Sequence, residues 1–125
     1  MKLRASVEGL AVPATVATAN LPKDTLMKIS GNKTVAKADA NAHPIGRLVV
    51  PATSANGPGT IETHAKELIE ILFSGNIAAG AFVKLAAPDG TTGENVAAAW
   101  VSGTDGAERI FGVVWKGANG TVGEV

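Results

Sequence analysis

Four segments of the first half of the chain recur in the same order in the second half. Residues 20–29 match residues 76–85 at an offset of 56. The other matches pair 35–38 with 96–99, 45–49 with 111–115, and 59–61 with 120–122, at offsets of 61, 66 and 61. The offsets change only in stretches rich in Gly, Asn and Asp, where turns absorb extra residues. The pattern predicts an internal duplication within one domain spanning 1–125, with repeat halves at about 9–63 and 65–125.

Each half reads as a series of short strands. In residues 25–30 and 81–86, apolar and polar side chains alternate around a lysine. The turn-forming pairs Gly31-Asn32 and Asp89-Gly90 follow these segments. Return strands are expected at 34–38 and 95–101, and closing strands at 60–63 and 121–125. The runs 47–51 and 110–115 are nearly continuously apolar, which predicts strands buried on both faces. The expected fold is all-β, a small sandwich or barrel.

One segment has two interpretations. In residues 65–73 the apolar residues fall at helical spacing, which by itself predicts an amphipathic helix. At offset 56, however, this segment matches residues 9–17, which contain Pro13 and three β-branched residues. A proline inside a helix costs about 3 kcal/mol. If both copies share a fold, residues 66–74 form a strand.

Composition excludes several classes of function. The chain has 125 residues, no cysteine, 11 basic and 11 acidic side chains, and a formal net charge of zero. Disulfide scaffolds, thiolate metal sites and cysteine nucleophiles are therefore excluded. A neutral chain also lacks the basic excess with which proteins attract nucleic acid. Its 22 alanines and 15 glycines give it a thin core, and such a core is often supplemented by oligomerisation.

No membrane segment is expected, because no stretch of 18 residues is free of charge. The first residues, Met1 to Arg4, resemble the start of a signal peptide, but Glu8 and Pro13 interrupt the apolar region that should follow. We therefore expect no cleaved signal.

The side chains that could support chemistry have simpler interpretations. Asp89 and Asp105 lie in Asp-Gly turns, where the carboxylate bonds its own backbone. His43 and His64 are expected at the surface, since the spacing of His64 from Glu62 and Glu67 fits no zinc site. Glu67 and Glu70 are expected on a solvated strand face. The sequence predicts no catalytic, cofactor-binding or metal-ligating residue, and therefore no enzyme.

Two regions are candidates for contact with a partner. Trp100 and Trp115 are the largest side chains of the chain, and they serve either as core or as interface anchors. Residues 2–6 alternate in character and have no counterpart in the repeat, so the first eight residues form a possible arm that adds to a neighbour's sheet edge. The predicted partner contacts are Lys2, Leu3, Arg4, Val7, Leu10, Trp100 and Trp115.

The second half resembles the small capsid decoration (cement) proteins of tailed bacteriophages. Residues 79–85 read Ala-Gly-Ala-Phe-Val-Lys-Leu, and a hairpin, the segment 110–114 (Ile-Phe-Gly-Val-Val) and Gly-Thr-Val at 120–122 follow. The first half departs from this pattern, with Lys23 and Asp24 in place of Ala-Gly and with Arg47 inside the apolar run.

The resemblance implies a virion protein without catalytic residues or cofactor. Such a protein is made in the bacterial cytoplasm and binds the major capsid protein on the outer surface of the capsid. It is often a trimer or dimer and cements neighbouring capsomers, with no role for nucleic acid or membrane. The alternative is a small β-barrel binding module for a glycan or a protein partner. A small hydrolase or an enzyme subunit is the third candidate.

Overall fold

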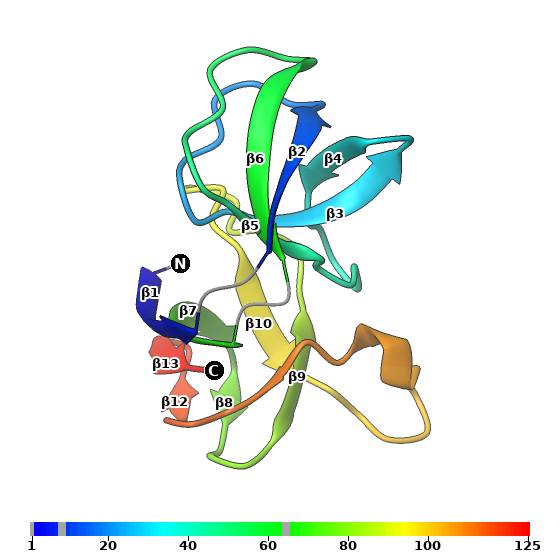
Figure 1. Cartoon of the computed structure of the whole chain (residues 1–125). Helices are drawn as coiled ribbons and strands as arrows, with labels where there is room; N and C mark the ends of the chain where they lie inside the picture. Colours follow the sequence, from blue (N-terminus) through cyan, green and yellow to red (C-terminus); the bar gives the residue numbers. More distant parts are fainter. Residues whose placement is uncertain (1, 8–9, 64–65) are drawn as a thin grey trace. The chain divides into compact units, whose positions relative to one another are not determined.

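A computed structural model describes residues 2–7, 10–63 and 66–125 of the chain (Figure 1). Within that part the regular structure is β-strand, apart from the 3₁₀ turn η1 (Ala107–Arg109). The predicted all-β class with a barrel is confirmed. The chain divides into two compact units, which we describe separately. The barrel unit holds residues 5–38 and 44–67, and the sheet unit holds residues 1–4, 39–43 and 68–125.

The barrel unit is a closed barrel in the order β2-β4-β3-β5-β6. Its strands are β2 (Leu10–Val16), β3 (Leu26–Gly31), β4 (Thr34–Lys37), β5 (Gly46–Leu48) and β6 (Gly57–Thr63). Because side chains alternate between the two faces of a strand, every second residue points inward. The buried apolar side chains that cluster in this unit are Val16, Leu21, Met27, Val35, Leu48, Ala52 and Ile61.

The sheet unit is organised around β7 (Lys66–Ser74). The strand order is β1-β7-β10-β9-β11, and β13 (Val122–Glu124) also pairs with β7. The remaining strands are β1 (Lys2–Val7), β9 (Phe82–Leu85), β10 (Val96–Ala99) and β11 (Gly112–Val113), with β8 (Asn76–Ile77) and β12 (Ala118–Asn119) as a separate pair. Ile71, Phe73, Val83, Leu85 and Ala97 are almost completely buried in this unit.

The segment with two interpretations is a strand. Residues 66–74 form β7, which confirms the strand prediction and makes the helical interpretation wrong. Leu72 faces Val96 of the parallel strand β10 and Val122 of the antiparallel strand β13. A central strand with neighbours on both edges satisfies its backbone groups through the sheet, and this tertiary pairing outweighs the helical spacing of the side chains. Ala65 lies outside the described residues.

The two units pair their strands in closely corresponding registers. In the barrel unit Leu26 faces Arg47 and Met27 faces Gly46. In the sheet unit, Phe82 faces Val113 and Val83 faces Gly112, at offsets of 56 and 66. The same offsets relate the bridge of Leu21 and Ala52 to the pair formed by Ile77 and Ala118.

Backbone hydrogen bonds repeat in the same way. The Asp24 amide donates to Leu48 O, and the Gly80 amide donates to Val114 O, both at 2.8 Å. Asp24 and Gly80 also share a positive φ, of 67° and 84°. Similarly, the Ala38 amide donates to Leu26 O and the Trp100 amide to Phe82 O. These correspondences support an internal duplication, although the descent of both halves from one β unit stays a prediction.

The fourth sequence match does not follow the pairing. Ile61 of β6 faces Val12, whereas Val122 of β13 faces Leu72, which corresponds to Val16. The two closing strands are therefore out of register by four residues. The register of β9 with β10 also differs by one residue from the register of β3 with β4. In the latter pair, β3 carries a register shift between Ile29 and Gly31.

Some strand details predicted from sequence are wrong. The apolar runs give only the short strands β5 and β11, and they are not buried on both faces, because Val50, Val113 and Trp115 are exposed. The first hairpin turns at Asn32 and Lys33, one residue later than expected, and Lys33 carries the positive φ. Continuous apolar character therefore did not distinguish a buried strand from an exposed apolar surface.

Candidate interaction surface

The described residues offer little for catalysis. They contain no group of three or more His, Cys, Asp or Glu side chains that could hold a metal ion. His43 is exposed, and its Nδ1 donates a hydrogen bond to the Glu108 carbonyl oxygen, 2.8 Å away. Asp89 accepts bonds from the Thr91 and Thr92 amides, as the turn interpretation predicts. These bonds, that of Thr92 first, lower the pKa of the Asp89 carboxyl. His64 and the side chain of Glu67 lie outside the described part.

Arg47 forms the centre of an ion-pair triad in the barrel unit. Its guanidinium lies 2.6 Å from the Asp24 carboxylate and also pairs with the Glu62 carboxylate. Residue 47 faces Leu26 on one side and Glu62 on the other, so the cross-strand register brings cation and anion together. The triad is an internal structural element, since buried charges are tolerated only when they are paired.

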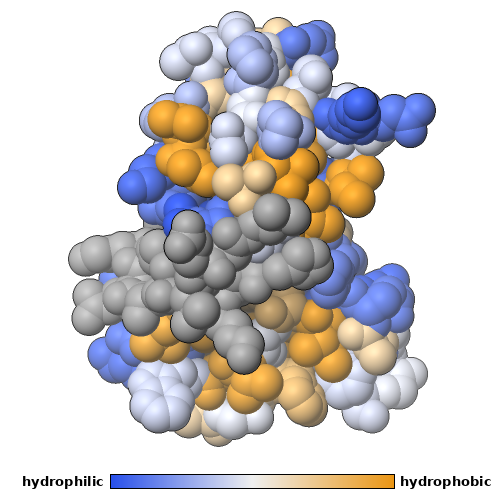
Figure 2. All heavy atoms as spheres, viewed as in Figure 1, coloured by the Kyte–Doolittle hydropathy of each residue, from blue (hydrophilic) through white to orange (hydrophobic). Residues whose placement is uncertain are grey.

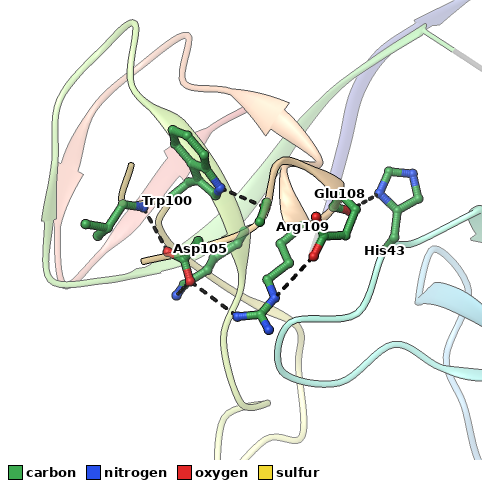
Figure 3. A network of polar contacts seen from close by, with 8 residues as sticks. His43, Trp100, Asp105, Glu108 and Arg109 are labelled. Atoms are coloured by element: carbon green, nitrogen blue, oxygen red, sulfur yellow. Dashed lines mark hydrogen bonds and ion pairs between the residues drawn. The ribbon is translucent and has the colours of Figure 1, made fainter. Parts of the chain in front are cut away.

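Asp105 forms the centre of a polar network in the sheet unit (Figure 3). Its side chain is 2% exposed and accepts a hydrogen bond from Lys84 Nζ at 2.6 Å and another from the Val101 amide at 2.8 Å. The Arg109 guanidinium lies 3.5 Å from the same carboxylate, and its Nε lies 3.9 Å from Glu108. The hydrogen bond from Lys84 is the main cause that lowers the pKa of the Asp105 carboxyl. The network fixes the loop that follows Trp100.

This loop holds an aromatic pair in place. The indole Nε1 of Trp100 donates to the Gly106 carbonyl oxygen at 3.0 Å. The Trp100 ring meets Phe82 edge to face, with centroids 6.0 Å apart. Such a pair contributes about 0.5–1.5 kcal/mol beyond area burial. Both rings are therefore held by contacts within the chain.

Phe82, Trp100 and Val113 form an apolar row on the outer face of the sheet unit. Phe82 and Val113 face each other across β9 and β11, and the Phe82 ring also meets the Trp100 ring. Phe82 and Val113 are 48% and 49% exposed, and Trp115, in the bend that follows β11, is 73% exposed. In Figure 2, apolar side chains coloured orange reach the molecular surface among polar ones. The row is the strongest candidate for an interaction surface in the described part of the chain.

The predicted partner-contact residues have different environments. Trp100 is half-buried at the edge of the row, and Trp115 is exposed, so the core interpretation fails for Trp115. Lys2, Leu3, Arg4 and Val7 belong to β1, which neighbours β7 of the same chain, and Leu10 begins β2. Their side chains lie outside the described part, and their contact with a partner stays a prediction.

Sequence reasoning missed Phe82, Val113 and the contact of Lys84 with Asp105. The alternation around Lys84 places Phe82 and Lys84 on one face of their strand, a signal that was available. No sequence signal indicated which face of the sheet would be covered.

By its fold, the chain is an all-β protein with a closed barrel. Among the described residues, no buried polar side-chain atom lacks a hydrogen-bond partner. No helix among these residues is long and apolar enough to cross a membrane.

Comparison with known proteins gives one informative likeness. No protein-family model matches the chain, and no curated protein matches it. Among solved structures the fold is similar to the N base of the head fiber gp8.5 of bacteriophage phi29. The identity is 16%, the TM-score is 0.53, and the match covers 96% of this chain and 92% of that one. At this identity the likeness establishes the fold, and both units take part in it.

Proposed function

We propose that this chain is a non-enzymatic structural protein of a tailed-phage virion. It binds the major capsid protein on the outside of the assembled capsid and stabilises the capsid by cementing neighbouring capsomers. It is made in the bacterial cytoplasm, acts as a dimer or trimer, and needs no cofactor, nucleic acid or membrane.

One observation carries the proposal: the whole-chain likeness to the base of a phage head fiber. The likeness extends over both units rather than over one widespread barrel, and it agrees with the resemblance of residues 76–122 to capsid decoration proteins. The described polar groups support this function, because Asp24, Arg47, Glu62, Lys84 and Asp105 are occupied in internal ion pairs. A protein that works by contact area needs a rigid scaffold and an exposed apolar surface, and the apolar row supplies that surface.

Capsid binding tests the proposal. Shells are assembled from the major capsid protein of the phage that carries this chain, without other surface proteins, and mixed with the purified full chain. We expect the chain to sediment with the shells at a saturable stoichiometry and to raise the temperature at which the shells disrupt. Bovine serum albumin in place of the chain is the control. A chain that stays in the supernatant at every concentration contradicts the proposal.

A binding module for a glycan is the second candidate, and it has one observation in its favour. Two of the five aromatic residues, Phe82 and Trp100, form an edge-to-face pair on the outer face of the sheet unit, and Phe82 is half exposed. Aromatic faces are suited to flat apolar ligand surfaces. A glycan array separates the two functions: strong selective glycan binding together with no capsid binding favours the module.

A further inference from the structure

One edge of β3 in the barrel unit is uncovered over its second half. β5 pairs with β3 only at Leu26 and Met27, so no strand of the described part lies beside residues 28–31 on that edge. On its other edge β3 pairs with β4, as the cyan hairpin of Figure 1, and the register shifts between Ile29 and Gly31. Such a shift re-aims the neighbouring side chain. In the hairpin tip, residues 28–33, every residue after the first is exposed.

Ile29 supplies the large apolar side chain of the hairpin tip, and it is 66% exposed. Leu85 occupies the equivalent position of β9, at the offset of 56, and is 1% exposed in the core of the sheet unit. The same position of the repeat is therefore part of the core in one unit and part of the surface in the other. Because removal of a large aliphatic side chain from water is favourable, a partner that covers Ile29 gains binding free energy.

Positive charge gathers on the same hairpin. Four lysines lie on it or shortly before it: Lys23, Lys28, Lys33 and Lys37. Within the described part of the chain, Lys33 and Lys37 make no ion pair. The acidic side chains described in the barrel unit, Asp24 and Glu62, both pair with Arg47 instead. The hairpin therefore presents cations that the described carboxylates of its own unit do not neutralise, although the whole chain has a formal net charge of zero.

We propose that the hairpin tip docks on an acidic protein surface of the capsid, with Ile29 as the apolar anchor and Lys33 and Lys37 as the surrounding cations. Protein interfaces combine a buried apolar centre with a polar rim, and complementary charges speed association and fix orientation. Nucleic acid fits this surface less well, because the tip has no aromatic ring on which a base could stack. The inference rests on the proposed function and deepens it, since cementing of neighbouring capsomers requires a contact surface besides the apolar row.

The test is cosedimentation of the full chain and its point variants with shells of the major capsid protein, at about 50 mM and about 500 mM salt. I29S removes the anchor, and K33E reverses one charge. V50S and K116E are the matched controls, because Val50 is 56% exposed in the barrel unit after β5, and Lys116 is exposed in the sheet unit. We expect I29S to raise the Kd at least about tenfold at both salt concentrations. K33E should raise it about fivefold at low salt and much less at high salt, and the controls should stay within about twofold of the wild type. Circular dichroism and thermal unfolding check that every variant is folded.

The inference is overturned if either I29S or K33E binds shells as tightly as the wild type at low salt. Two further measurements, binding to a DNA duplex and self-association without shells, identify other occupants of the tip. If I29S and K33E weaken one of these and leave capsid binding unchanged, the tip belongs to that occupant and the inference is wrong. Failure of the proposed function is a distinct result, because there the wild type itself does not bind shells at either salt concentration, and the inference is then wrong as well.

Discussion

Lys84 and Asp105 meet at 2.6 Å, although 21 residues separate them along the chain. The contact joins the outer face of β9 to the loop between β10 and η1. Because Val101 donates its amide to the same carboxylate and Trp100 bonds Gly106, this one ion pair supports the segment 100–106, which carries Trp100 of the aromatic pair. The first prediction concerns its dependence on pH.

D105N removes a pH-dependent contribution to stability. The pKa of the Asp105 carboxyl in the folded chain lies below its ordinary value of 3.8, chiefly because Lys84 donates a hydrogen bond to it. A lowered pKa contributes stability that is present above the ordinary value and is lost as pH falls through the folded-state value. We expect the difference in free energy of unfolding between wild type and D105N to be larger at about pH 6 than at about pH 3. Urea unfolding measures it, and equal differences at both pH values contradict the prediction.

Arg47 is expected to be the most sensitive charged residue of the barrel unit. R47M leaves the carboxylates of Asp24 and Glu62 without their shared cation, which we expect to cost about 3 kcal/mol of the free energy of unfolding. The double variant R47M/E62Q should lose less than the sum of the single variants, because one unpaired charge is removed. R109M is the control. Its guanidinium is more exposed, so a cost below about 1 kcal/mol is expected. If the loss of stability in R47M/E62Q equals the sum of the losses in the two single variants, Arg47 and Glu62 are not energetically coupled, and the prediction is contradicted.

Gly46 is required by the close approach of two strands. A Cβ atom at this position would lie 2.1 Å from the backbone oxygen of Glu62, and that oxygen belongs to the paired strand β6. We expect G46A to lower the free energy of unfolding by about 1–3 kcal/mol. G90A is the matched control, since nothing lies within 4 Å of its Cβ, and a change within about 0.5 kcal/mol is expected. Thermal unfolding of both variants side by side decides the matter, and equal behaviour contradicts the prediction.

Deletion of residues 2–7 tests the role of the first strand. Because β1 neighbours β7 in the chain's own sheet, its removal exposes backbone groups along β7, and each lost hydrogen bond costs about 0.5–1.5 kcal/mol. We expect a loss of more than about 2 kcal/mol. A5P is a milder variant that removes one amide donor from β1. A deletion variant with unchanged stability and weaker capsid binding would instead support the free arm that the sequence suggested.

Much of the strand pattern could be predicted from the sequence. Alternation around Lys28 and Lys84 gave the two equivalent strands β3 and β9, and the repeat gave β7 as a strand where helical spacing indicated otherwise. These predictions succeed because periodicity and turn residues act locally, and because a repeated segment carries two independent examples of one pattern. The absence of cysteine also excluded thiolate chemistry without any structure.

Only the tertiary structure decided what each face meets. Alternation shows which side of a strand Val113 or Arg47 points to, but it does not show whether that side is covered. The structure buries Arg47 between two carboxylates and leaves Val113 and Trp115 exposed, the reverse of what their hydropathy suggests. It also brings Lys84 to Asp105 across the fold. Burial and ion pairing depend on contacts between segments distant in sequence, and a local pattern cannot contain that information.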